Sequence, residues 1–229
     1  MHTGEDDLLH RVVLGVIEPA AYWHVYSDKY PPTAANPYSE ARLAWRDGAH
    51  SMFYAGDTPA AALWEVALRS AVVRRGRVYT DAGNLAGMKL ARVTLTREVP
   101  VIDLRPPYRR EVVDANCDLD SFWDGVLKQS DHGPTHEVSA RLMKQLVDAG
   151  YHAGAALRWH SRQGGSDSVL LFFEPPMSST WWVCDATFRL DMPDGQEQIR
   201  EALAAQKLIW VGAPIGKEFE PGPDDALDG

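Results

Sequence analysis

Short runs of apolar residues, rich in β-branched and aromatic side chains, recur along the chain between more polar segments. Such runs predict strands, because these side chains favour a pleated, half-buried backbone. We expect strands at residues 21–27, 51–56, 88–95, 99–104, 155–159, 168–174, 181–186 and 207–212. Residues 168–174 (SVLLFFE) are apolar almost throughout, which predicts a central strand buried on both faces.

Helical spacing of apolar positions predicts four further segments. An N-terminal helical extension is expected over residues 1–20, with acidic residues in its first turn. A second helix starts at Pro59, behind Asp57 and Thr58, either of which can cap it, and runs to about residue 73. Two amphipathic helices are expected at residues 135–150, ending at a glycine, and at residues 195–206.

The irregular order of these elements predicts an α+β fold. We expect one folded domain over residues 21–212, followed by a tail, 213–229, whose proline, glycine and acidic residues predict disorder. The long polar connection 28–50 contains three prolines. Structureless stretches of this length inside a domain are usually functional or mobile.

Composition narrows the function classes. The chain has 23 Lys and Arg against 32 Asp and Glu, a net charge of −9, so we expect no direct nucleic-acid binding and no membrane partner. The acidic N-terminus is unlike a secretory signal, and no apolar run is long enough to span a bilayer. Cys117 and Cys184 are too few for a disulfide framework or a cysteine zinc site. These features predict a cytoplasmic protein.

Glu65 is the first candidate for chemistry, because it is the only ionisable residue in the stretch 59–68. An ionised carboxylate on an apolar helix face is costly unless it is paired or used. The alternative is an exposed glutamate paired with Arg69 at the i,i+4 spacing.

A second candidate is the run Arg158-Trp159-His160-Ser161-Arg162 at the end of a predicted strand, before a glycine-containing turn. Two guanidinium groups, an imidazole and a hydroxyl can hold an anion such as a phosphate. The alternative is an ordinary polar strand-to-turn transition. His132 and His136 are four residues apart, but Pro134 lies between them, so we expect no metal site.

Taken in order, these segments resemble the RES family, the toxin domain of a bacterial toxin–antitoxin class. Tyr54-Ala55 running to Ala62 and Glu65 is similar to the family's Tyr-Ala passage that ends in Ala-x-x-Glu. The later Gly154 to Arg162 segment is similar to its glycine-to-Ser-Arg passage before an apolar strand.

The resemblance implies an ADP-ribosyltransferase-like fold, with mixed and antiparallel sheets flanked by helices around a cleft that binds NAD as substrate. Glu65 would then stabilise the positive charge that develops as the nicotinamide–ribose bond breaks. Tyr54 would stack on the nicotinamide ring. Ser161, with Arg158 or Arg162, would position ribose or phosphate. No metal is required, because the leaving nicotinamide is already a cationic pyridinium.

The chain departs from the family in its first motif, where His24 stands in place of an arginine. Diphtheria-toxin-like transferases use a His-Tyr-Glu trio, which His24, Tyr54 and Glu65 resemble in order and type. A histidine here can donate a hydrogen bond to the adenosine ribose or the carboxamide; the alternative is a structural strand residue. For the arginine of the family's next passage, we expect Arg42, with Arg46 as the alternative.

The resemblance therefore implies a RES-like catalytic domain over residues 21–212 that acts as an NAD-consuming toxin, an NAD glycohydrolase or phosphorylase. An Xre-type helix-turn-helix antitoxin is the implied partner, with its C-terminal segment blocking the cleft. Two alternatives stay open: a mono-ADP-ribosyltransferase with a protein acceptor, and a catalytically idle domain that binds a nucleotide or a partner protein.

Overall fold

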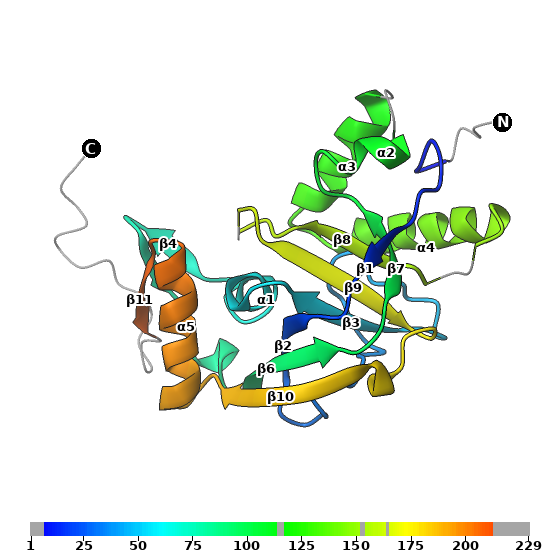
Figure 1. The fold of residues 1–229 in the computed structure, drawn as a ribbon. Coiled ribbons are helices and arrows are strands. Elements are labelled where there is room, and N and C mark those ends of the chain that lie inside the picture. Colours follow the sequence, from blue (N-terminus) through cyan, green and yellow to red (C-terminus); the bar gives the residue numbers. More distant parts are fainter. Residues whose placement is uncertain (1–6, 114–116, 152–153, 164, 213–229) are drawn as a thin grey trace, which may run out of the picture.

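Eight strands form one large curled sheet, and a second, small sheet of three strands lies at its side (Figure 1). The computed structural model describes residues 7–113, 117–151, 154–163 and 165–212. In this part of the chain, five α-helices accompany the two sheets. The expected α+β class with mixed sheets is confirmed.

The large sheet is antiparallel except where β7 runs parallel to β8. Its strands, in spatial order, are β1 (Gly15–Ile17), β7 (Val99–Asp103), β8 (Ala156–His160), β9 (Ser168–Glu174), β3 (Ser51–Gly56), β2 (Ala21–Ser27), β6 (Met88–Leu95) and β10 (Trp182–Arg189). As predicted, β9 is buried along its length, between β8 and β3. β2 and β3 share the single residue pair Trp23–Gly56, so the sheet opens between them.

Helices cover the sheet at two places (Figure 1). The first group is α2 (Arg110–Val113), α3 (Cys117–Lys128) and α4 (Gly133–Asp148). The second is α1 (Pro59–Glu65) and α5 (Pro193–Ala205), which pack on each other, with the small sheet β11 (Ile209–Gly212), β5 (Arg77–Tyr79) and β4 (Val72–Arg74) beside them. Short 3₁₀ turns lie at Ala82–Asn84 and Ser179–Trp181.

The predicted N-terminal helix is absent from the part of residues 1–20 that the structure describes, so this prediction is wrong there. Residues 7–14 contain no helix, and Gly15–Ile17 pairs with β7 as a strand. The Gln145 side chain explains the difference. Its carbonyl accepts hydrogen bonds from the backbone N–H groups of Leu8 and Leu9, and its amide donates to the Leu9 carbonyl. Tertiary hydrogen bonds and burial of both leucines therefore replace the helical ones.

α1 is shorter than predicted. It ends at Glu65, and residues 72 and 73, expected to be its last residues, lie in strand β4 instead. The expected disordered tail, 213–229, lies outside the described residues. Among those that are described, no helix combines the length and apolarity needed to cross a membrane.

Candidate active site

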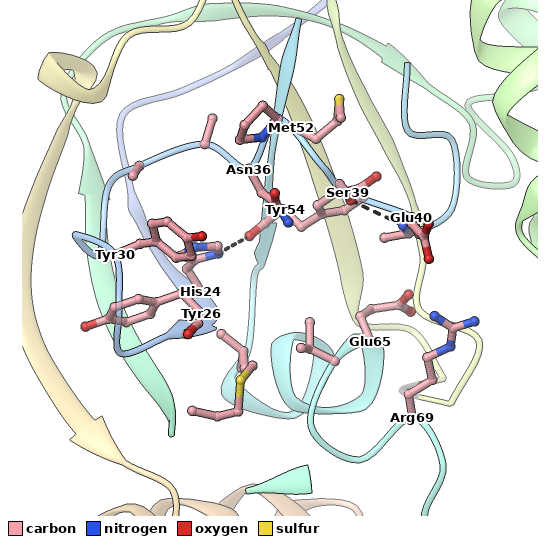
Figure 2. Close-up of a pocket in the computed structure, with 18 residues that line it drawn as sticks. His24, Tyr26, Tyr30, Asn36, Ser39, Glu40, Met52, Tyr54, Glu65 and Arg69 are labelled. Carbon is pink, nitrogen blue, oxygen red and sulfur yellow. Dashed lines mark hydrogen bonds between the residues drawn. The ribbon is translucent and has the colours of Figure 1, made fainter. Parts of the chain in front are cut away.

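A cavity of about 380 Å³ lies where the large sheet opens between β2 and β3. Its walls come from these two strands, from the C-terminal end of α1 and from the connection 28–50 (Figure 2). The connection has no helix or strand and is joined to β3 by one bridge, between Asn36 and Met52. Polar and apolar residues of this connection, between Tyr30 and Ala41, form one wall of the cavity.

The cavity has two chemically different ends (Figure 2). Glu65 and Arg69 lie at one end, near Ser39 and Glu40 of the connection. At the other end are His24, Tyr26 and Tyr30. Tyr54 lies between the two ends. The volume falls within the range typical of small-molecule sites.

The local sequence explains why Glu65 reaches the cavity. Thr58 caps α1 by accepting a hydrogen bond from the Ala61 N–H at 3.0 Å, and Pro59 follows in the first turn. The alanines of α1 let it pack closely on the sheet and on α5, and the helix stops at Glu65. Glu65 is half-buried, so the alternative of an exposed glutamate is wrong, although the charge of Arg69, beyond the end of the helix, still acts on the Glu65 carboxylate.

The Glu65 carboxylate is held by the segment that follows β8. Ser161 Oγ donates a hydrogen bond to Glu65 Oε1 at 3.1 Å, and the backbone N–H of Arg162 donates to the same carboxylate. Burial raises the pKa of Glu65, while Arg42, these two hydrogen bonds and Arg69 act in the opposite direction. The result is a half-buried carboxylate with fixed donors and positive charge around it.

Tyr54 is fixed at its hydroxyl. The phenolic oxygen donates to the backbone carbonyl of Arg42 at 2.9 Å, which sets the position of the ring in the cavity wall. Burial raises the pKa of Tyr54 well above its ordinary value, so the phenol is neutral at physiological pH. Tyr54 therefore offers an aromatic ring that is held in place next to Glu65.

His24 is a buried, neutral ring at the second end of the cavity. Its Nδ1 lies 2.6 Å from the Tyr54 carbonyl oxygen, which can only accept, so Nδ1 carries the proton. Burial lowers the pKa of His24 to about 4, and the ring stacks on Phe53 at 4.2 Å. The remaining nitrogen, Nε2, is therefore unprotonated. From the sequence we expected His24 to donate a hydrogen bond; in the tautomer that the Tyr54 carbonyl requires, Nε2 is an acceptor instead.

Arg42 lies behind Tyr54 rather than in the cavity wall. The residue is only 3 % exposed, and its guanidinium donates to the Val126 carbonyl at 2.8 Å and lies 3.4 Å from His132 Nε2. Burial lowers the pKa of Arg42, and burial with the nearby arginines lowers that of His132 to about 4. Arg42 thus supplies buried positive charge to Glu65 through space.

Of the other predicted arginines, Arg162 contacts Glu65 through its backbone, while Arg46 and Arg158 lie elsewhere. Arg46 is at the surface, 3.4 Å from Glu40. Arg158 is on β8, which β9 separates from β3, and its Nε is buried. Arg162 has an exposed side chain and contributes its backbone N–H.

Sequence reasoning missed part of the wall. The sequence suggested Arg69 only as an ion-pair partner of Glu65, yet Arg69 lines the cavity together with Ser39, Asn36 and Tyr30. The one available signal was the long polar connection, which has no periodicity from which to choose residues. Within the described ranges, no group of three or more His, Cys, Asp or Glu side chains is arranged to hold a metal ion.

The fold and site define a mixed α+β domain whose opened sheet holds a carboxylate, a serine and a tyrosine around a cavity. A family model described as RES domain matches residues 14–191, more than half of the chain. The chain therefore belongs to the RES domain family. The matched range contains the whole cavity wall and both residues that hold Glu65. A search of curated proteins finds no match.

Proposed function

We propose that this protein consumes NAD by breaking the nicotinamide–ribose bond, as a glycohydrolase or a phosphorylase, and that it acts as a toxin. The observation that carries the proposal is Glu65, held by Ser161 at 3.1 Å and by the Arg162 N–H at one end of a cavity that Tyr54 also lines. Membership of the RES domain family supports the same chemistry.

The residues suit a dissociative reaction. As the bond between C1′ of the ribose and the pyridinium nitrogen breaks, its electron pair leaves with neutral nicotinamide, and positive charge develops on the ribose. A fixed carboxylate stabilises that charge most where water is excluded, and Glu65 is half-buried. Water or phosphate then adds to C1′ and gives up a proton. NAD is the only cofactor-like molecule required, as substrate, and no metal takes part.

Two further groups suit the substrate. The ring face of Tyr54 can stack on the cationic nicotinamide, which is attracted by the electrons of the ring. His24 Nε2 can accept a hydrogen bond from a ribose hydroxyl or from the carboxamide N–H. Arg69, in the cavity wall, supplies positive charge for the diphosphate.

The proposal is tested in cells. Induced wild-type chain should empty the NAD pool and stop growth, whereas Glu65→Gln should do neither. Glu197→Gln is the matched control, because Glu197 is exposed and pairs with Arg200 on α5, away from the cavity. Growth arrest by Glu65→Gln equal to that by wild type would contradict the proposal.

Transfer of ADP-ribose to a protein acceptor is the second candidate. The connection that walls the cavity exposes large aromatic side chains, with Tyr30 61 % and Tyr38 79 % exposed, which suits contact with a protein. Product analysis separates the chemistries: free ADP-ribose indicates hydrolysis, ADP-ribose phosphate indicates phosphorolysis, and label retained on protein indicates transfer. A catalytically idle binding domain would yield none of these products.

A toxin of this kind needs a neutralising partner. We propose an Xre-type helix-turn-helix antitoxin whose C-terminal segment occupies the cavity, and we propose the cytoplasm as the compartment, because NAD is available there. Co-expression with a cognate antitoxin of this type should restore growth. Failure of such a protein to bind the purified chain would contradict this part of the proposal.

A further inference from the structure

Asp167 lies in the loop between β8 and β9 and makes three hydrogen bonds that converge on the Glu65 site. Its Oδ2 accepts from Thr58 Oγ1 at 2.9 Å and from Gln206 Nε2 at 3.4 Å. Its backbone carbonyl accepts from the Ser161 N–H at 2.8 Å. The side chain and the main chain of one residue therefore contact different parts of the site's framework.

The side-chain contact fixes the start of α1. Thr58 Oγ1 accepts from the Ala61 N–H as the helix cap and donates its own proton to Asp167. The cap hydroxyl is thus oriented by the carboxylate, and chains of hydrogen bonds of this kind strengthen one another. Because α1 is only seven residues long, fixing its start also limits where Glu65, at its end, can lie.

A second route reaches the other end of α1. Gln206 donates to Asp167 through its amide nitrogen and accepts from Trp64 Nε1 at 2.7 Å through its amide oxygen. Trp64 immediately precedes Glu65 and is almost fully buried. Both ends of α1 are therefore attached to Asp167, one directly and one through Gln206.

The main-chain contact fixes the partner of Glu65. The bond from the Ser161 N–H to the Asp167 carbonyl closes the loop after β8, and Ser161 Oγ then meets Glu65 Oε1. We propose that Asp167 is a positioning residue that holds the Ser161 hydroxyl and the Glu65 carboxylate at hydrogen-bonding distance. This inference rests on the proposed function, in which Glu65 is the catalytic carboxylate.

The first test is kinetic and uses Asp167→Ala. The matched control is Asp185→Ala, since Asp185 also accepts from a threonine hydroxyl, that of Thr94 at 2.7 Å, but on β6 and β10. We expect Asp167→Ala to lower kcat for NAD by roughly ten- to a hundred-fold, with KM changed less, because misplaced catalytic groups cost rate more than binding. Asp185→Ala should match wild type. Equal kcat in all three chains would overturn the proposal.

The second test does not need activity. The charged groups that act on Glu65 are Arg42 and Arg69, with the Ser161 hydroxyl and the Arg162 N–H as hydrogen-bond donors. Asp167→Ala keeps the main-chain carbonyl that binds the Ser161 N–H, but it removes the side-chain bonds to Thr58 and Gln206 that hold this carbonyl in place. The hydrogen bond from Ser161 Oγ to Glu65 is then less well held, which weakens one influence that lowers the Glu65 pKa. In ¹³C-labelled chain, Asp167→Ala should therefore move the Glu65 carboxyl titration to higher pH, and Asp185→Ala should not.

The two tests separate the two claims. If wild type releases no nicotinamide, the proposed function fails, while the Glu65 titration still decides the role of Asp167. An unshifted titration in Asp167→Ala overturns the positioning role whatever the turnover. Should Asp167→Ala unfold, Thr58→Val removes the donor of the same hydrogen bond and should likewise move the Glu65 titration to higher pH. Thr58→Ser keeps the hydroxyl, so in that variant Glu65 should titrate as in wild type. No shift in Thr58→Val would also overturn the role.

Discussion

Burial and the proposed function favour opposite protonation states of Glu65. Burial favours the protonated acid, whereas stabilising a developing cation needs the carboxylate. Arg42, Arg69, Ser161 and the Arg162 N–H are arranged so that they favour the charged form. Such a residue is expected to cost stability in exchange for activity.

This cost predicts that Glu65→Gln stabilises the fold at neutral and alkaline pH. The pKa of Glu65 is raised in the folded state, so its contribution to stability is complete below the unfolded pKa and is lost as the pH rises through the folded pKa. Glutamine resembles the protonated acid at every pH. The Tm of Glu65→Gln should exceed that of wild type at pH 8, with the difference shrinking toward pH 4. A lower Tm for the variant at pH 8 would contradict this.

His24 predicts a different pH dependence. Burial lowers its pKa from 6.5 to about 4, so the neutral ring stabilises the fold above pH 6.5, and this contribution is lost as the pH falls toward 4. Asparagine can still donate to the Tyr54 carbonyl but does not titrate. Urea unfolding of His24→Asn should therefore show a shallower loss of stability between pH 6.5 and 4. Part of the loss should persist, because His132 has the same depressed pKa. An unchanged slope would contradict the buried, neutral state of His24.

At the scale of elements, the junction between β3 and α1 places the helix on the sheet. A Cβ at Gly56 would lie 2.6 Å from the Ala62 nitrogen and 2.8 Å from the Thr58 carbonyl oxygen, both backbone atoms. The close approach of strand and helix therefore needs a residue without a side chain. Because α1 carries Glu65, this contact sets both stability and the geometry of the site.

We predict that Gly56→Ala destabilises the fold by about 1–3 kcal/mol, the usual cost of overpacking, and lowers NAD turnover. Gly125→Ala is the control, since a Cβ on that glycine of α3 meets no atom within 4 Å, and it should be neutral or slightly stabilising. Urea unfolding of both variants makes the comparison. Equal stability of Gly56→Ala and wild type would contradict this prediction, because it would show that the junction can accommodate a Cβ.

Among the elements, the longer strands are the ones that the sequence predicts well. Strands β2, β3, β6 and β9 occur at the expected residues, because alternating or continuous burial follows from local pattern. β4 and β5 were missed, since three-residue strands carry too little pattern. The N-terminal helix failed because tertiary hydrogen bonds from Gln145 override a local propensity.

At the scale of the whole molecule, the fold decides which candidate residues meet. It brings together Glu65, Tyr54, His24 and Ser161, each predicted from motif order, around one cavity or its carboxylate. Arg42 is near them but buried behind Tyr54, and spacing alone cannot distinguish a cavity-lining arginine from one that points into the core. Arg69 is the opposite case, because the sequence suggested only a helical neighbour of Glu65. Since α1 ends at Glu65, Arg69 instead lies in the cavity wall.

The central claim is that this cavity cleaves NAD through Glu65, and nicotinamide release by the purified chain tests it most directly. Wild type, freed of any co-purified partner, should release nicotinamide steadily in buffer alone if it is a hydrolase, on addition of phosphate if it is a phosphorylase, or on addition of a lysate if it is a transferase. Glu65→Gln should be slower by roughly 10²–10³-fold, the usual loss when a fixed electrostatic group is removed, and Glu197→Gln should match wild type. Absence of release from wild type, or equal release from Glu65→Gln, would contradict the account.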